Sequence, residues 1–430
     1  MDVILYSKLM QLENKVNESS VIPTPSGFKW TDNPMEGHIF RTEAGITTDI
    51  DVGSFRPTGK TYWVDPNGSD SNSGEDADHP LQLIKTAMNK SDVAVVMLKN
   101  GYYNYGRTPQ HLNGYAKSIA VVAAEGASPV LGSDEGVPTW TKTDGYTYVY
   151  EAAQRSCCAY DLVNNVAYLQ VGSIAEVEAT AGTYFSTNTP SNITYVHMLD
   201  GGEPKYSKIR ICKNYDVFRI TASGAITVYI EGLTICGGGY GGFRVTSDGS
   251  TRPTVYAKNC RFFGSLTNSA MYMEGCTSIV QNCEAAYALD DGFGYHAKTL
   301  EPRAIEINCE GHHNGLEGDT DNGSTMHDGG CIIRVNGKYH HNRGPNVADV
   351  HNSTDSWNIG CHAWRSDQSA QTTQNSDFVC SDSGADMWLD NCSAYGSYYS
   401  LLANSTGKVY ERGNAFVTRY VGDNCAIESY

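Results

Sequence analysis

Short alternations of apolar and polar residues recur along the second half of the chain. Each alternation is typical of a β-strand, and each is followed by Asn or Gly and often by Cys. The first five of these turn markers are spaced by 27, 23, 26 and 28 residues, and the markers are Gly232, Asn259, Asn282, Asn308, Asn336 and Asn391. A step of this size predicts the stacked coils of a solenoid.

Stacking explains the residue types found at these turns. Neighbouring strands of a sheet lie about 4.8 Å apart, so that like side chains lie over like. We expect the marker asparagines to form a ladder of amides, and the cysteines that follow them to be buried: Cys260, Cys283 and Cys309. The sequence His-His-Asn occurs twice, and its histidines are expected to stack: His312, His313, His340 and His341.

An earlier segment, Thr61 to Tyr103, places a strand, a polar loop, a short amphipathic helix and a second strand in succession. This order resembles the start of a β-helix of the pectate-lyase-like superfamily, in which such a helix covers the open end of the solenoid. An uncovered end would expose sheet edges and core. The resemblance implies an all-β fold, namely a right-handed, single-stranded parallel β-helix with an N-terminal capping helix.

The remaining segments complete the expected organisation. Residues 1–20 carry apolar residues at heptad spacing, which predicts a short helix that either docks on its own chain or forms a coiled-coil stalk: Leu5, Leu9, Leu12 and Val16. Residues 21–60 are interpreted as a linker or a small N-terminal module. The β-helix is predicted over residues 61–430, with a lateral β insertion at about 136–206, where Tyr-rich and Thr-rich sequence interrupts the repeat.

Composition and charge narrow the class of protein. The chain has 430 residues, 40% of them hydrophobic, and a formal net charge of −17, so a nucleic-acid partner is not expected. No run of 18 apolar residues occurs, so membrane insertion is not expected. The 13 cysteines include no CxxC pair and no secretory signal is recognised, so we expect free thiols and synthesis in a reducing cytoplasm. No cofactor is predicted.

Candidate chemistry concentrates between residues 287 and 365, where Asp, Glu and His are dense. The stretch YALDDGFGYHAK begins at Tyr287, and stacking brings the polar residues of later coils beside it. The predicted catalytic residues are Asp290, Asp291, His296, His327 and Asp328. The predicted substrate-binding residues are Glu317, Asp349, His351, Arg343, Trp357 and Tyr295, and no metal site is predicted.

These residue types suit more than one reaction. Carboxylates about 5 Å apart suit a retaining glycosidase, and a wider separation suits an inverting one. The same groups suit β-elimination from a uronic acid, in which a cation neutralises the sugar carboxylate: Lys298, Arg303, Arg334 or Arg343. Simpler interpretations stay open, because Asp290 and Asp291 precede Gly and fit a tight turn, and the aromatic residues fit packing between coils.

The heptad seam, the missing signal and the start of the β-helix together resemble a phage tailspike or tail-fibre protein. That resemblance implies a homotrimer in the virion tail that binds and cleaves a bacterial surface polysaccharide; an extracellular location is the alternative. We favour an enzyme, a depolymerase acting by glycoside hydrolysis, with Asp291 and Asp328 as acid and base. The alternatives are a non-catalytic receptor-binding adhesin and a polysaccharide lyase or epimerase.

Overall fold

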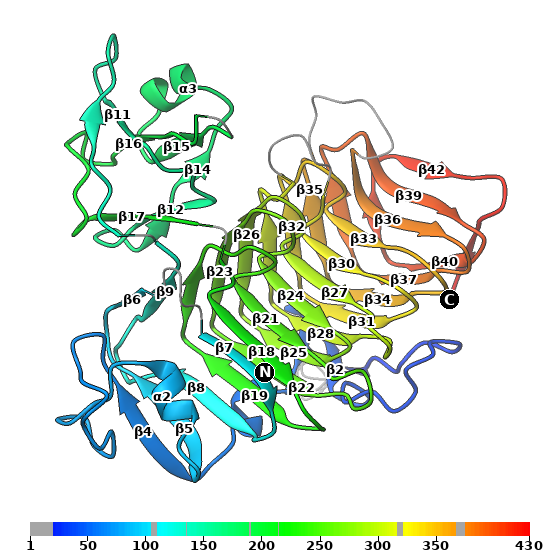
Figure 1. Cartoon of the computed structure of the whole chain (residues 1–430). Coiled ribbons are helices and arrows are strands. Elements are labelled where there is room, and N and C mark those ends of the chain that lie inside the picture. The colour runs from blue at the N-terminus through cyan, green and yellow to red at the C-terminus, as the bar shows by residue number, and fades with distance from the viewer. Residues whose placement is uncertain are drawn as a thin grey trace, which may run out of the picture.

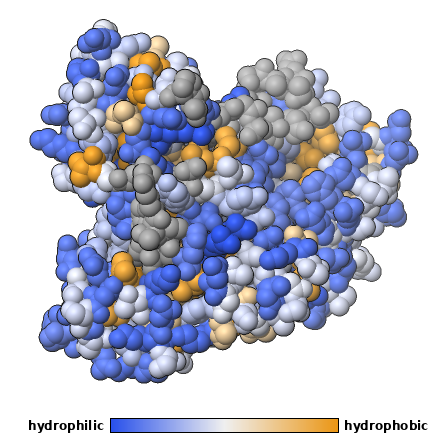
Figure 2. Space-filling model, viewed as in Figure 1, coloured by the Kyte–Doolittle hydropathy of each residue, from blue (hydrophilic) through white to orange (hydrophobic). Residues whose placement is uncertain are grey.

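The computed structural model shows a chain wound into a parallel β-helix (Figure 1), and it describes residues 20–104, 110–134, 136–188, 191–213, 215–315, 321–366 and 375–430. From residue 227 onward each coil contributes one strand to each of three long parallel sheets. The predicted parallel β-helix is therefore confirmed. Hydrophilic residues cover most of the face seen in Figure 2, as the net charge of −17 leads one to expect.

The three long sheets are named here in the order in which a coil visits them, and their strands are given for the described part of the chain. Sheet 1 contains β4 (Lys60–Val64), β5 (Val93–Leu98), β8 (Ile119–Ala123), β19 (Thr227–Glu231), β22 (Thr254–Lys258), β25 (Thr277–Gln281), β28 (Arg303–Ile307), β31 (Cys331–Val335), β34 (Asp355–Ile359), β37 (Asp386–Asp390), β40 (Lys408–Arg412) and β43 (Ala426–Ser429). Sheet 2 contains β6 (Tyr102–Asn104), β9 (Val130–Gly132), β20 (Thr234–Cys236), β23 (Arg261–Ser265), β26 (Glu284–Ala288), β29 (Glu310–His312), β32 (Lys338–His340), β35 (His362–Trp364), β38 (Ser393–Tyr395) and β41 (Ala415–Phe416). Sheet 3 contains β7 (Gln110–Tyr115), β18 (Phe218–Ala222), β21 (Phe243–Thr246), β24 (Met271–Glu274), β27 (Phe293–His296), β30 (Ser324–Met326), β33 (Val347–Asp349), β36 (Ser376–Asp382), β39 (Tyr399–Ser405) and β42 (Arg419–Val421).

The turn from sheet 1 to sheet 2 explains the asparagine spacing. Asn282 and Asn308 adopt φ values of 54° and 52°, in the left-handed region that Asn tolerates better than most residues. The Asn282 amide donates to Asn259 Oδ1 at 3.2 Å, and the Asn308 amide donates to Asn282 Oδ1 at 3.2 Å. The predicted amide ladder is confirmed. The cysteines that follow are buried, and all 13 cysteines are free thiols, as expected.

A short helix closes the N-terminal end of the core. Helix α2 (Ile84–Met88) contacts β4, β5 and β7 and buries Ile84, Ala87 and Met88 among the apolar residues of the first coils. The heptad seam of residues 1–20 lies outside the described residues, except Ser20. In the described part of the chain, no helix is long and apolar enough to cross a membrane.

An N-terminal segment covers the outer face of sheet 1. It contains β1 (Ser20–Val21), β2 (Ile39–Thr42), β3 (Gly45–Thr48) and the 3-10 helix η1 (Val52–Phe55). Phe28 of this segment packs against Trp357 of β34 and Trp388 of β37, with ring centroids 6.4 Å and 5.7 Å away. The outer face of sheet 1 therefore also carries buried apolar residues, among them Ile305 and Ile333.

A lateral unit stands off the side of the early coils (Figure 1). It contains two small sheets and one helix, formed by β10 (Thr141–Lys142), β11 (Val149–Ala152), β12 (Cys158–Asp161), β13 (Val166–Ala167), β14 (Leu169–Gln170), α3 (Ile174–Ala179), β15 (Thr183–Ser186), β16 (Thr194–His197) and β17 (Ile209–Cys212). It has an apolar core of its own, which includes Tyr168, Tyr184 and Ile211.

Candidate functional site

Sheet 3 carries a polar patch on its outer face. Alternate residues of a strand point to opposite faces, so Phe293 and Tyr295 of β27 enter the core while Gly294 and His296 face outward. The parallel register aligns His296 with Glu274 of the preceding coil. Residues at the start and end of these strands complete the patch, which we call the sheet-3 site.

Three carboxylates meet where the chain enters sheet 3. Asp290 and Asp291 lie in the turn between β26 and β27, and Asp321 lies shortly before β30. One oxygen from each carboxylate lies within 4.8 Å of the other two. Asp291 is 2% exposed and accepts hydrogen bonds from the backbone and side-chain nitrogens of Asn322, at 3.0 Å and 2.8 Å.

A stack of rings lies beside the carboxylates. His296 lies between Tyr272 and His327, with ring centroids 4.7 Å and 4.3 Å away. His327 Nε2 lies 3.6 Å from Asp291 Oδ2, and His327 Nδ1 lies 3.2 Å from His351 Nδ1. His296 and His327 follow the aligned residues Tyr295 and Met326 of adjacent coils, whereas Tyr272 is aligned with Gly294, two residues before His296.

Burial sets the charge state of these groups. Burial, aided by the neighbouring charge of His327, lowers the pKa of His296 to about 3, so this imidazole is neutral at neutral pH. Burial alone would raise the pKa of Asp291, but its contacts with His327, His296 and the Asn322 backbone N–H lower it overall. The site therefore holds a buried carboxylate beside a neutral imidazole.

Asp328 and His351 lie past the other end of these strands. His351 Nδ1 lies 3.6 Å from Asp328 Oδ1, and Asp328 Oδ2 accepts a hydrogen bond from the Ala297 backbone at 3.3 Å. Asp328 adopts φ 57°, in the left-handed region that Asp and Asn enter more readily than most residues. Of the predicted catalytic residues, Asp290, Asp291, His296 and His327 thus gather closely, and Asp328 flanks them.

Two overlapping sets of side chains could hold a metal ion. Asp291, His296 and His327 place one ligand atom each within 4.8 Å of one another, and so do Asp290, Asp291 and Asp321. The first set offers nitrogen and oxygen ligands, and the second offers oxygen alone. Both sets share Asp291, the most deeply buried carboxylate of the site.

Three predicted substrate-binding residues are in the interior, which corrects that prediction. Tyr295 occupies an inward position of β27 and is aligned with Met326 of the next coil. Met326 is aligned in turn with Asp349, which therefore also points inward. There Asp349 accepts two hydrogen bonds from Arg334, at 2.8 Å and 2.9 Å, so Arg334 is not available to a polysaccharide either. Trp357 is fully buried beneath Phe28 of the N-terminal segment.

The other three predicted substrate-binding residues differ in where they lie. His351 is exposed and belongs to the sheet-3 site through its contact with His327. Arg343 is exposed and lines a separate cavity. Glu317 lies outside the described residues. Of the other cations considered, Arg303 forms an ion pair with Asp32 of the N-terminal segment.

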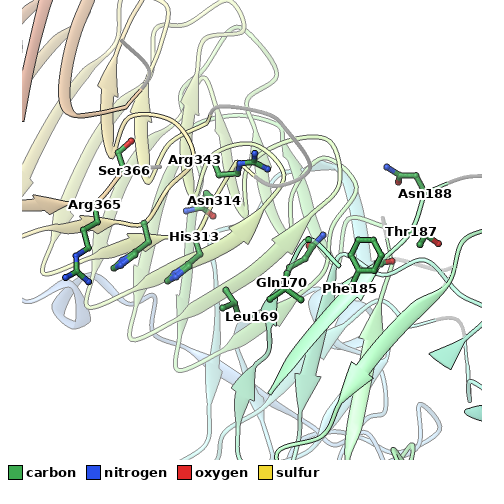
Figure 3. Close-up of a pocket in the computed structure, with 14 residues that line it drawn as sticks. Leu169, Gln170, Phe185, Thr187, Asn188, His313, Asn314, Arg343, Arg365 and Ser366 are labelled. Atoms are coloured by element: carbon green, nitrogen blue, oxygen red, sulfur yellow. The ribbon is translucent and has the colours of Figure 1, made fainter. Parts of the chain in front are cut away.

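The cavity lined by Arg343 lies between the lateral unit and the coils (Figure 3) and has a volume of about 1000 Å³. The lateral unit contributes residues 169–172 and 185–188, and the coils contribute His313, Asn314, His341, Arg343, Arg365 and Ser366. The cavity adjoins the sheet-3 site through the backbone, because Gly315 N donates to Asp290 O at 3.2 Å and Gly344 N donates to Asp321 O at 3.0 Å.

The paired histidines beside the cavity form the predicted stack. His312 and His340 are parallel with centroids 5.0 Å apart, and so are His313 and His341. The histidine pair of one coil contacts a glutamate of the preceding coil: His340 Nε2 lies 2.8 Å from Glu310 Oε1, and His340 Nδ1 lies 2.8 Å from His341 Nδ1. The stacking prediction is confirmed.

Sequence reasoning missed several residues of the sheet-3 site. Ser269, Tyr272 and Asn322 come from turns or strands without a distinctive motif, and only the coil register brings them together. Gly294 could have been found, because a glycine at an outward strand position within the motif DDGFGYH indicates that neighbouring atoms approach the backbone closely there. A Cβ there would lie 2.0 Å from Ser269 Oγ and 3.0 Å from His296 Nε2.

Comparison with known proteins bears on the fold. No protein-family model and no curated protein sequence matches the chain. A solved structure described as a glycoside hydrolase matches with a TM-score of 0.52 at 9% identity, over 86% of this chain and 96% of that chain. The likeness to that structure concerns the fold, which in this chain is a parallel β-helix.

Two further solved structures are similar to this β-helix at lower scores. The pectate lyase Pel9A matches with a TM-score of 0.44 at 15% identity, over 87% of this chain and 80% of that chain. The tailspike protein gp49 of Pseudomonas phage LKA1 matches with a TM-score of 0.24 at 10% identity, over 79% and 76%. At such identities the likeness concerns the fold, and activity must be argued from the site itself.

Proposed function

We propose that this protein binds a polysaccharide along the outer face of sheet 3 and cleaves its glycosidic bonds by hydrolysis. The observation that carries the proposal is the meeting of Asp290, Asp291 and Asp321, with one oxygen of each within 4.8 Å of the others. Glycoside hydrolysis needs such a carboxylate pair. A long solenoid face also suits a chain-like ligand.

The environments of the three carboxylates differ, and we assign their catalytic roles from this difference. Asp290 and Asp321 are half-buried and reach the surface, whereas Asp291 is enclosed and held by Asn322. We assign the acid and the nucleophile of a retaining mechanism to Asp290 and Asp321, because the spacing is nearer to 5–5.5 Å than to the wider inverting arrangement. This replaces the pairing of Asp291 with Asp328, which lies past the other end of the strands.

In a retaining mechanism the two carboxyl groups, here Asp290 and Asp321, act in separate roles. One carboxylic acid gives its proton to the glycosidic oxygen as that C–O bond breaks, while the other carboxylate attacks the anomeric carbon. Water then displaces the carboxylate, with the first residue acting as base. The solved glycoside hydrolase that shares the fold over 86% of this chain supports hydrolysis as a chemistry that such a scaffold accommodates.

The biological setting is also a proposal. The heptad seam in residues 1–20 supports a homotrimer in a phage tail that attacks a bacterial surface polysaccharide. Sedimentation of the full chain should then give three times the chain mass of 46.8 kDa. Removal of residues 1–19 should lower the assembly state or weaken it. A monomeric full chain would count against the tailspike setting and leave the sheet-3 site untouched.

The proposed hydrolysis is tested on a panel of bacterial capsule, cell-wall and acidic plant polysaccharides. Reducing ends and the ultraviolet absorbance of unsaturated sugars are followed together. We expect new reducing ends without absorbance, and a fall of 10²-fold or more for Asp290→Asn and for Asp321→Asn, roughly what loss of an acid or base costs. Asp423→Asn, at an exposed position of the last coil, serves as the matched control.

Each other outcome identifies a different function. Absorbance that rises with the reducing ends would make the protein a lyase. Binding of one polysaccharide without cleavage would make it an adhesin. Equal activity in the parent and in both variants would remove Asp290 and Asp321 from the mechanism.

A further inference from the structure

Four buried polar atoms without a hydrogen-bond partner lie in and around the sheet-3 site. In the described part of the chain they are His296 Nε2, His327 Nε2, Asn322 Oδ1 and Thr325 Oγ1. Thr325 belongs to the strand that pairs with β27, directly opposite Gly294. Buried polar groups in folded proteins are nearly always satisfied by protein, water or an ion, so a group of such atoms marks a place for bound water or an ion.

We propose that Asp291, His296 and His327 bind one divalent transition-metal ion of the Zn²⁺ class. One ligand atom from each residue lies within 4.8 Å of the other two, and the Asp291 Oδ2 to His327 Nε2 distance is 3.6 Å. Bonds to zinc of about 2.0–2.2 Å place tetrahedral ligand atoms roughly 3.3 Å apart. Side-chain rotations of the two imidazoles would bring the three atoms to that spacing.

The ligand types decide which ion fits. Two imidazole nitrogens and one carboxylate oxygen suit Zn²⁺ and its neighbours in the first transition row. Ca²⁺ and Mg²⁺ prefer oxygen ligands alone, so they do not match His296 and His327. The oxygen-only set of Asp290, Asp291 and Asp321 has no orphaned nitrogen aimed at it, and we propose no ion there.

The surroundings of the three ligands resemble the support that metal ligands usually have. A ligating histidine commonly donates its other ring N–H to a neighbour, and His327 Nδ1 lies 3.2 Å from His351 Nδ1. Asn322 holds the second oxygen of Asp291 through two hydrogen bonds. Tyr272 stacks on His296, with ring centroids 4.7 Å apart.

The three side chains supply three of the four ligands that a tetrahedral ion takes. Gly294 allows Ser269 and His296 to approach this closely, because a Cβ at residue 294 would lie 2.0 Å from Ser269 Oγ and 3.0 Å from His296 Nε2. Three protein ligands with one open position are typical of a metal ion that meets water or a substrate. The metal site therefore goes beyond the proposed hydrolysis and does not depend on it.

The proposal is tested by metal binding, without an activity assay. The full-length protein is stripped with a chelator and titrated with Co²⁺, a spectroscopic substitute for Zn²⁺. We expect one equivalent per chain, visible absorption bands of a low-symmetry site, and competition by Zn²⁺ but not by Ca²⁺. His296→Ala and His327→Ala should each weaken binding at least 100-fold, and His351→Ala should weaken it by about 10-fold.

Two controls show whether Co²⁺ binds at the proposed ligands. His341→Ala removes a half-buried, stacked histidine beside the cavity and should leave Co²⁺ affinity unchanged. Thermal melts of each variant show whether it is folded. Cobalt bound by the cysteines would show a thiolate charge-transfer band instead, and this result would overturn the proposal. So would folded His296→Ala and His327→Ala variants that bind Co²⁺ as tightly as the parent.

The metal site and the proposed hydrolysis can be supported or overturned independently of each other. If Co²⁺ binds as expected while no polysaccharide is cleaved, the metal site stands and hydrolysis fails. If the stripped protein cleaves a polysaccharide and takes up no metal, hydrolysis stands and the metal site fails.

Discussion

At the scale of single residues, the coil turns depend on asparagine for two separate reasons. Asn308 adopts φ 52°, and its side chain both donates to Asn282 and accepts from Asn336, at 3.2 Å and 3.4 Å. Glycine would satisfy the backbone but not the ladder, and alanine would satisfy neither. The two contributions can therefore be measured apart.

We predict that Asn308→Ala lowers the free energy of unfolding by roughly 2 kcal/mol and Asn308→Gly by about 1 kcal/mol. The larger loss combines left-handed backbone strain with the lost amide bonds. Denaturant unfolding of the parent and both variants measures the difference. Equal losses would show that the backbone conformation contributes nothing.

Asp377 on β36 offers a pH-dependent test away from the sheet-3 site. Its Oδ1 accepts hydrogen bonds from Asn346 and Ser397, at 2.8 Å and 2.6 Å, while its buried Oδ2 has no hydrogen-bond partner. Burial raises its pKa to about 7. The unfolded chain releases this proton near pH 4 and the folded chain keeps it to about pH 7, so stability falls as pH rises between these values.

We predict that Asp377→Asn flattens this dependence. The parent should lose about 3 kcal/mol of unfolding free energy from this group between pH 5 and pH 8, and the variant should not. Urea unfolding at both pH values gives the comparison. A loss of the same size in parent and variant would mean that Asp377 is ionised throughout.

At the scale of elements, the N-terminal segment behaves as a cover for sheet 1. Phe28 is 2% exposed and contacts two tryptophans from different coils. The Lys29 backbone N–H also donates to Asp355 at 2.9 Å, and Arg41 forms an ion pair with Asp390 at 2.9 Å. These contacts fix a segment distant in sequence across several coils.

We predict that Phe28→Ala destabilises the protein by about 3–4 kcal/mol, the usual cost of deleting a buried ring. Trp357 and Trp388 should become more accessible to a fluorescence quencher. Phe55→Ala is the matched control, because Phe55 is 39% exposed and stacks on the ring of Tyr256 at the surface. If the two variants lose equal stability, the cover contributes little.

The same elements show what the sequence could and could not predict. The Asn and Cys spacing predicted the coils because stacked positions need the same residue type in every coil. Clustering of Asp and His in sequence located Asp290, Asp291, His296 and His327. It also selected Tyr295 and Asp349, because clustering in sequence does not distinguish inward from outward strand positions, and both residues point inward. Trp357 could not be excluded from sequence, since its cover comes from Phe28, far away in the chain.

At the scale of the whole molecule, the β-helix places the polar patch of sheet 3 and a cavity side by side. The sheet-3 site holds the carboxylates and the ring stack, and the neighbouring cavity of about 1000 Å³ lies under the lateral unit. Backbone hydrogen bonds from Gly315 and Gly344 join the two. A polysaccharide chain that crosses sheet 3 would therefore pass close to both.

The most direct measurement is a crystal structure of Asp290→Asn with a bound oligosaccharide, taken from the polysaccharide that the parent degrades or binds. The account predicts sugar units along the outer face of sheet 3, with one glycosidic oxygen within hydrogen-bond reach of position 290 or Asp321. Sugar bound only in the cavity beside Arg365, or on another face, would contradict the placement of the active site at the carboxylates.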